Sequence, residues 1–203
     1  GFWINPGDRD RMLQTIKEKG RVYNQEYNIR IKSGEILTEL LSAVPIQFKG
    51  EPCLVTIITD ITGQKRLEKA LQESEEKFSR AFNASPDAIT ITTIGDNPVF
   101  LEVNDGYTRL IGYTRDELLN RPVGEFDTWV TDEEREKFVR HIDNRVRMRN
   151  EEIRLRTKSG GIRTMLASSE YVQIGGRPCV VIAGSDITEY KETEKELSKY
   201  EQQ

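Results

Sequence analysis

The chain has 203 residues, of which 36% are hydrophobic and 32% are charged, and its net charge is −4. The apolar content can supply a core for one or two small domains, whereas 30 Lys and Arg against 34 Asp and Glu give no general attraction for nucleic acid. No apolar run approaches the roughly 20 residues of a membrane span, and residues 1–6 lack a secretion signal, so we expect a cytoplasmic chain without membrane contacts.

The first predicted elements are a helix that opens at Asn5-Pro6-Gly7-Asp8 and three strands that end at Asp60-Ile61-Thr62. The same pattern recurs without gaps 126 residues later (129 − 3, 186 − 60). The matched residues are Trp3 with Trp129, Asn24 with Asn150, Lys32-Ser33-Gly34 with Lys158-Ser159-Gly160, Pro52-Cys53 with Pro178-Cys179, and Asp60-Ile61-Thr62 with Asp186-Ile187-Thr188. Residues 75–126 have no earlier counterpart, so we expect residues 1–62 to be the C-terminal half of a domain whose complete form spans residues 85–188.

A linker helix is predicted over residues 63–84, between the two copies. Its apolar side chains recur at heptad spacing, and Glu and Lys fill most other positions. The stripe consists of Leu67, Leu71, Ser74, Phe78 and Ala81. It predicts a homodimer that pairs through the linker helices, and the alternative is that the stripe packs on its own domain.

Two short strands are predicted next, around residues 88–91 and 99–103, followed by short helices that Gly112 and Pro122 interrupt. A longer helix is predicted to begin at Thr131, with Phe138, Ile142 and Val146 as its buried stripe. Three strands then follow over residues 152–156, 162–174 and 179–184, joined by glycine-containing turns. This order indicates an α+β domain whose helices cross one face of an antiparallel sheet, with a final helix over residues 189–203.

The two cysteines do not resemble a disulfide framework, and with one histidine in the chain we expect no metal site. Cys53 and Cys179 each lie in an apolar run, which predicts a small buried strand residue in both copies. No nucleophile stands beside a base and no phosphate-binding loop is present, so we expect no enzyme.

Three segments resemble the PAS family in their order and spacing: Ser85-Pro86-Asp87-Ala88, the run from Asn104 to Leu118, and Asp186-Ile187-Thr188. Asn120 departs from the pattern, because the family usually has Gly there. The resemblance implies a five-stranded antiparallel sheet with helices on one face that can enclose a small ligand. It also implies an exit helix that leads to a fused or downstream output domain, such as a histidine kinase or a cyclic-dinucleotide synthase.

The alternation of the strands predicts a ligand pocket, or in the plainer interpretation an ordinary packed core. Its predicted lining is Ile91, Tyr107, Trp129, Phe138, His141, Ile153, Leu155, Met165 and Ala183. Heme-binding relatives use a histidine on the helix that carries His141, but this residue is a single His with no supporting motif. A flavin adduct needs a cysteine on the helical wall, where neither Cys lies, so we expect neither heme nor flavin.

A signal relay is predicted at the two exits, through Asp60 and Thr62 in the first copy and Asp186, Thr188 and Glu189 in the second. Asp186 followed by Glu189 resembles a capping box at a helix start. The leading hypothesis is a regulatory module that senses a small molecule or a partner and moves these exit helices. The rival hypothesis is a ligand-free dimerisation spacer whose pocket is filled by its own core.

Overall fold

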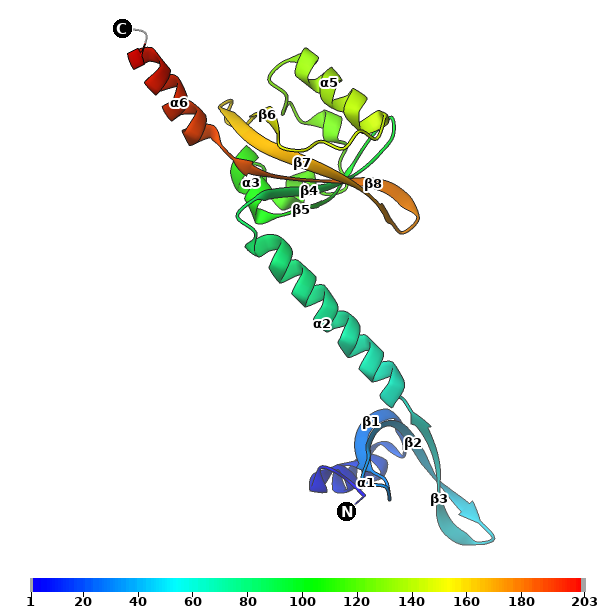
Figure 1. Ribbon diagram of the computed structural model, residues 1–203. Coiled ribbons are helices and arrows are strands. Elements are labelled where there is room, and N and C mark those ends of the chain that lie inside the picture. The colour runs from blue at the N-terminus through cyan, green and yellow to red at the C-terminus, as the bar shows by residue number, and fades with distance from the viewer. Residues whose placement is uncertain (1, 202–203) are drawn as a thin grey trace. The chain divides into compact units, whose positions relative to one another are not determined.

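The structure is a computed structural model that describes residues 2–201. The described residues form two compact units, which divide between Glu76 and Lys77 and are treated separately (Figure 1).

In the first unit a helix packs on a three-stranded antiparallel sheet with the strand order β1-β2-β3. Its elements are α1 (Pro6–Lys19), β1 (Val22–Arg30), β2 (Ile36–Phe48) and β3 (Glu51–Asp60). Proline at the first helical position and left-handed Gly20 after the last one set the limits of α1. Met12 of the helix packs on Val22, Leu41 and other residues of β1 and β2, which forms a small core.

The edge strand β3 is exposed along its whole length. Cys53 is therefore exposed, and the prediction that it is a buried residue is wrong. The apolar run around it still forms a strand, as the pattern predicted. No element covers this strand within residues 2–76, so the burial that an apolar run normally indicates is missing.

The linker helix α2 (Thr62–Ala84) forms as predicted. Its heptad stripe is not packed on either unit, because Leu67, Leu71 and Phe78 have exposed fractions of 74%, 62% and 54%. Phe78 stacks on Phe82, one turn further along the helix. The stripe is thus an apolar seam that is open within the chain.

The second unit contains a five-stranded, fully antiparallel sheet with the order β5-β4-β8-β7-β6, which confirms the predicted fold class. Its strands are β4 (Ala88–Thr93), β5 (Phe100–Val103), β6 (Glu151–Arg156), β7 (Ile162–Ile174) and β8 (Arg177–Asp186). Its helices are α3 (Asp105–Ile111), α4 (Arg115–Leu118), a 3-10 turn (Val123–Glu125), α5 (Asp132–Asp143) and the final α6 (Thr188–Glu201), labelled in part in Figure 1.

Local sequence signals set most of these limits. Thr131 caps α5 by accepting from the Glu134 amide at 3.2 Å, and Thr114 with Glu117 forms a reciprocal capping box on α4. Asn120 takes the left-handed conformation (φ 59°) in the turn where the family pattern has Gly, and Asn is among the residues that tolerate it best.

The predicted stripe on the long helix is wrong at Val146. Helix α5 ends at Asp143 and the chain turns through a left-handed Arg145 (φ 53°), so Val146 lies outside the helix and is 46% exposed. Met148 is buried instead, with an exposed fraction of 1%. Helical spacing therefore ceases to predict burial once the helix has ended.

The sheet of the second unit carries buried side chains on both faces. One face packs against α3, α4 and the loops around Phe126, in a cluster that includes Val103, Ile111 and Leu118. The other face holds a smaller cluster of Phe82, Ile91 and Cys179. Cys179 is fully buried, as predicted.

The two copies reproduce each other in backbone detail. Asn24 and Asn150 both adopt left-handed conformations (φ 47° and 54°). The amide of each donates to a serine of the next strand, to Ser42 at 2.9 Å and to Ser168 at 3.1 Å. The matched positions Asn24 and Asn150 therefore have the same local geometry.

Candidate functional site

The second unit contains a cavity of about 880 Å³ between the sheet and the segments that cross it, within the usual size range of small-molecule sites. Its sheet wall is formed by Ala88, Thr90, Thr92, Ile153, Leu155, Met165, Val180 and Ile182. Phe100 of β5 also borders the cavity, and the opposite wall includes Tyr107, Phe126, Trp129, Phe138 and Ile142. The cavity is thus lined mainly by apolar and aromatic side chains.

Six of the nine residues predicted to line a pocket border this cavity: Tyr107, Trp129, Phe138, Ile153, Leu155 and Met165. Ile91 and Ala183 do not, because side chains alternate along a strand and their neighbours Thr90 and Ile182 face the cavity. Ile91 packs instead on the opposite face of the sheet.

His141 is the third predicted residue that does not line the cavity. Its neighbours Phe138 and Ile142 on α5 border the cavity, whereas the His141 ring is 26% exposed and its Nδ1 lies 3.9 Å from Glu151 Oε2. Its backbone carbonyl accepts from the Tyr171 hydroxyl at 3.2 Å. The ring therefore lies at the β6 side of the helix and not in the cavity wall.

Three hydroxyl-bearing residues on the cavity wall are almost completely buried. Thr90, Thr92 and Tyr107 have exposed fractions of 5%, 7% and 8% and border the cavity. Within residues 2–201 none of these hydroxyls makes a hydrogen bond, and all three oxygens remain accessible from the cavity. Burial raises the pKa of the Tyr107 phenol, which keeps it protonated. We call this group the hydroxyl wall.

Sequence reasoning included Tyr107 but missed the two threonines. Their spacing of two residues predicts that Thr90 and Thr92 share one face of β4, but it does not say whether that face points to the cavity.

Charged side chains gather at the rim of the cavity, five of them acidic and two basic. They are Asp96, Glu125, Asp127, Asp132 and Asp143, with Arg135 and Arg156. Arg156 lies close to Asp127 (Nε to Oδ2, 3.4 Å) and donates to the Val130 carbonyl at 3.2 Å. The rim is therefore net acidic.

The last strand is joined to α6 by a compact set of hydrogen bonds, which we call the second junction (Thr164, Asp186, Ile187 and Thr188). The Ile187 amide donates to the Thr164 carbonyl at 2.8 Å, and the Thr164 amide donates to the Thr188 hydroxyl oxygen at 2.9 Å. The Asp186 carboxylate accepts from the Thr188 amide at 2.9 Å. The expected capping box with Glu189 is thus wrong in form, because Asp186 binds the first helical residue instead of the second.

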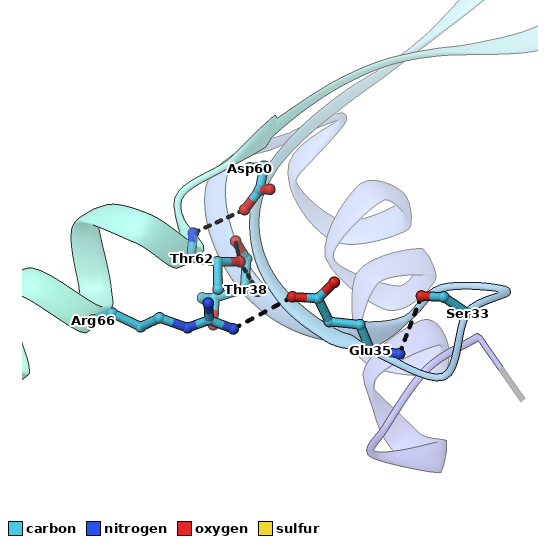
Figure 2. Close-up of polar contacts among 6 residues, drawn as sticks. All are labelled: Ser33, Glu35, Thr38, Asp60, Thr62 and Arg66. Atoms are coloured by element: carbon cyan, nitrogen blue, oxygen red, sulfur yellow. Dashed lines mark hydrogen bonds and ion pairs between the residues drawn. The ribbon is translucent and has the colours of Figure 1, made fainter.

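The first unit has the same arrangement, the first junction (Thr38, Asp60, Ile61 and Thr62), which Figure 2 shows in part. The Thr38 amide donates to the Thr62 hydroxyl oxygen at 2.8 Å, and Asp60 accepts from the Thr62 amide at 2.8 Å. Hydrogen bonding to Thr62 lowers the pKa of the Asp60 carboxyl. In Figure 2, Arg66 of α2 also reaches Glu35, 3.4 Å away in the turn before β2.

A duplicated ion pair ties each helix start to the first strand of its hairpin. Lys65 lies 2.8 Å from Glu26, and Lys191, at the matching position, lies 2.7 Å from Glu152. These hydrogen bonds raise the pKa of both lysines. Each exit helix is therefore held by two strands of its sheet.

Asn104 joins the end of α2 to the wall of the cavity. Its fully buried amide donates to the carbonyls of Phe82 (3.0 Å) and Asp87 (2.8 Å). Its amide oxygen accepts from the backbone amides of Ile89 (2.8 Å) and Tyr107 (2.9 Å). Sequence analysis gave Asn104 only a place in the family motif and missed these contacts.

A family model of the PAS domain matches residues 2–63 and 86–189, and the chain belongs to this family. PAS domains are sensory or regulatory modules of signalling proteins, and they commonly form dimers. No curated protein matches the chain. Within residues 2–201 no helix combines the length and the apolar character that a membrane span requires.

Several solved structures are similar to the chain. A PAS domain of an HTR-like protein from Haloarcula marismortui is 22% identical, with 61% of this chain and 99% of that chain covered and a TM-score of 0.47. An RNA-binding light-oxygen-voltage receptor is 14% identical over 98% of this chain and 87% of its own, with a TM-score of 0.48. A PAS domain from a two-component sensor histidine kinase is 26% identical over 57% of this chain and 98% of its own, with a TM-score of 0.43.

Proposed function

We propose that the chain is a regulatory module whose second unit binds a small molecule in the cavity and passes the change to α6. One observation carries this proposal: consecutive residues of β7 serve the two sites. Met165 borders the cavity, and Thr164 takes part in the second junction through both its backbone amide and its backbone carbonyl. A ligand that displaces Met165 must also strain the Thr164 peptide groups, because the two residues share a backbone.

In this proposal each junction passes a change in its sheet to the helix that follows it in the chain. Asp186 is paired with Met165 across the sheet, so movement of β7 reaches the start of α6 directly. The first junction would connect the first sheet to α2 in the same way. Asn104 would then pass the position of the α2 end to Tyr107 in the cavity wall. The output would be a kinase or cyclase domain, fused or downstream.

The proposed organisation is a C-terminal half of a PAS domain in residues 1–62, a linker over 63–84, a complete domain over 85–188 and a signalling helix from 189. The equivalence of the two junctions and of the two left-handed asparagines supports the first assignment. The cavity counts against the rival spacer hypothesis, since a spacer has no use for unfilled volume in its core.

The proposed form is a homodimer through α2, and the open seam of Leu67, Leu71 and Phe78 supports it. Leu71→Glu combined with Phe78→Glu should convert the dimer to a monomer in sedimentation equilibrium. Gln72→Glu with Ser79→Glu adds the same charge at exposed positions off the seam and serves as the control. A wild-type chain that is monomeric well above micromolar concentration would contradict the dimer.

Native mass spectrometry of the purified chain tests the sensory proposal against the spacer. The expected result is a retained small molecule that is absent from Ile182→Phe, a variant whose ring occupies part of the cavity. A ligand-free wild type that binds nothing from a metabolite library, with a melting temperature equal to that of Ile182→Phe or lower, would favour the spacer.

A further inference from the structure

The hydroxyl wall favours a ligand that has a polar atom able to form hydrogen bonds with it. Thr90 and Thr92 are more than nine-tenths buried and border the cavity, and neither hydroxyl makes a hydrogen bond to another described residue. Both hydroxyls are accessible from the cavity, so an occupant that bonds to them gains affinity over one that displaces their water without replacing its hydrogen bonds. Tyr107, which also borders the cavity, adds a third hydroxyl, and its phenol can both donate and accept.

The rest of the sheet wall is apolar and favours an apolar ligand surface. Leu155, Met165, Val180 and Ile182 contribute only apolar surface. Ile153 continues this surface along β6, and aromatic rings face it from the other side. Most of the surface of a suitable ligand is therefore apolar, with its polar atoms confined to the side that faces β4.

The charged side chains at the rim disfavour anionic ligands. Five carboxylates and two guanidinium groups line it, and Arg156 is close to Asp127. Glu125 is paired with Arg121 at 2.6 Å, so unpaired carboxylates remain in excess among the described residues of the rim. A cleft with an excess of one sign focuses the field and disfavours ligands of that sign. Charged side chains of the lining come only from the loops, α5 and the end of β6, so a buried anion would find no countercharge on β4, β7 or β8.

We infer, building on the proposed sensory function, that the cavity takes an uncharged, largely apolar molecule that presents one oxygen to Thr90 and Thr92. A hydroxyl or carbonyl oxygen fits this site, because a threonine hydroxyl can both donate and accept. A carboxylate or phosphate does not fit it.

Three probes of one shape test the inference at pH 7: 2-naphthol, which is neutral and polar at one end, naphthalene, which lacks the oxygen, and 2-naphthoate, which is anionic. Dissociation constants are measured by NMR titration of the intact chain. We expect 2-naphthol to bind roughly three- to tenfold more tightly than naphthalene, the worth of about one hydrogen bond. We expect 2-naphthoate to bind more weakly than 2-naphthol.

Valine substitutions assign the effect to the hydroxyl wall. Thr90→Val with Thr92→Val keeps the shape of both side chains and should reduce the affinity for 2-naphthol to that for naphthalene, whose own affinity should not fall. Thr90→Ser with Thr92→Ser keeps both hydroxyls and should keep the preference for 2-naphthol. Thr193→Val, which removes an exposed hydroxyl on α6, is the control.

Each other outcome overturns the inference in a recognisable way. If 2-naphthoate binds as tightly as 2-naphthol, the ligand class is wrong, while the cavity remains a binding site and the sensory proposal stands. If the valine variants keep the preference for 2-naphthol, the hydroxyl wall does not recognise the ligand. If none of the three probes binds, the inference fails, and the mass spectrometric comparison with Ile182→Phe decides separately whether the sensory proposal fails with it.

Discussion

The two strand-to-helix junctions have nearly the same geometry, although the sheets that they leave are covered very differently. Corresponding hydrogen bonds from Thr38 and Thr164 measure 2.8 and 2.9 Å. Strand β3 is an exposed edge, whereas β8 lies between β4 and β7. The junction is therefore determined by residues within a few positions of it and by the adjacent strand, and does not require a neighbour on the other side of the last strand.

Individual positions show how a strand that has neighbours on both sides differs in sequence from the exposed edge strand. Gly184 of β8 corresponds to Ile58 of β3, which is 48% exposed. A Cβ at Gly184 would lie 2.5 Å from the Leu166 carbonyl oxygen. Met165 on the cavity wall likewise corresponds to Glu39 in the first unit. The local junction is shared by both copies, whereas the close packing around the cavity belongs to the second.

Asn104→Ala should have the largest effect, and only in the second unit. It leaves two buried carbonyls and two buried amides without their partner, so the free energy of unfolding of this unit should fall by about 2–4 kcal/mol. Hydrogen exchange resolved by unit measures it. A loss of similar size in residues 2–60 would show that the two units are not independent.

Gly184→Ala should destabilise the second unit by about 1–3 kcal/mol, since the new methyl group meets backbone atoms that cannot move freely. Ile58→Ala, the matched change at the exposed position of the first unit, should cost less than about 0.5 kcal/mol. Equal costs in thermal or denaturant unfolding would contradict the difference in packing between the two strands.

Thr62→Val and Thr188→Val should have equal effects. Each removes the side-chain acceptor for one strand amide, which should weaken the helix start by about 1 kcal/mol. The measurement is amide exchange at Thr38 and Thr164. An effect at one junction without the other would break the proposed equivalence.

Glu39→Gln should have the smallest effect and should depend on pH. Burial, followed by the charge of Asp60, raises the pKa of Glu39 from 4.5. The stability associated with its protonated form is fully present below the unfolded pKa and is lost as the pH rises through the higher folded pKa. Stability of the first unit should therefore decline less with rising pH in Glu39→Gln than in the wild type. An unchanged pH profile of unfolding would show that Glu39 is not the group responsible.

Much of the fold followed from local signals in the sequence. The limits of β7 and the cap at Thr131 were predicted, because periodicity and capping chemistry are short-range properties. Which residues of β4 face the cavity could not be predicted in the same way. Ala88-Ile89-Thr90-Ile91 lies in a strand that is buried on both faces, so hydrophobic alternation did not indicate which residues face the cavity.

The remaining errors concern contacts that no local pattern reports. Burial of Cys53 depends on a neighbouring strand, and the position of Val146 depends on a left-handed turn at Arg145. The four hydrogen bonds of Asn104 join segments up to 22 residues away. The hydroxyl wall became evident only when the geometry showed that its hydroxyls lack partners.

Amide exchange at the two junctions, compared between the wild type and Ile182→Phe, tests the coupling of cavity and exit helix most directly. Filling the cavity should alter exchange at Thr164, Ile187 and the first turn of α6, because Met165 and Thr164 share the strand. The first junction, at Thr38 and Ile61, should remain unchanged and provides the internal reference. Unchanged exchange at the second junction, with the rest of the second unit equally stable, would contradict the proposed relay.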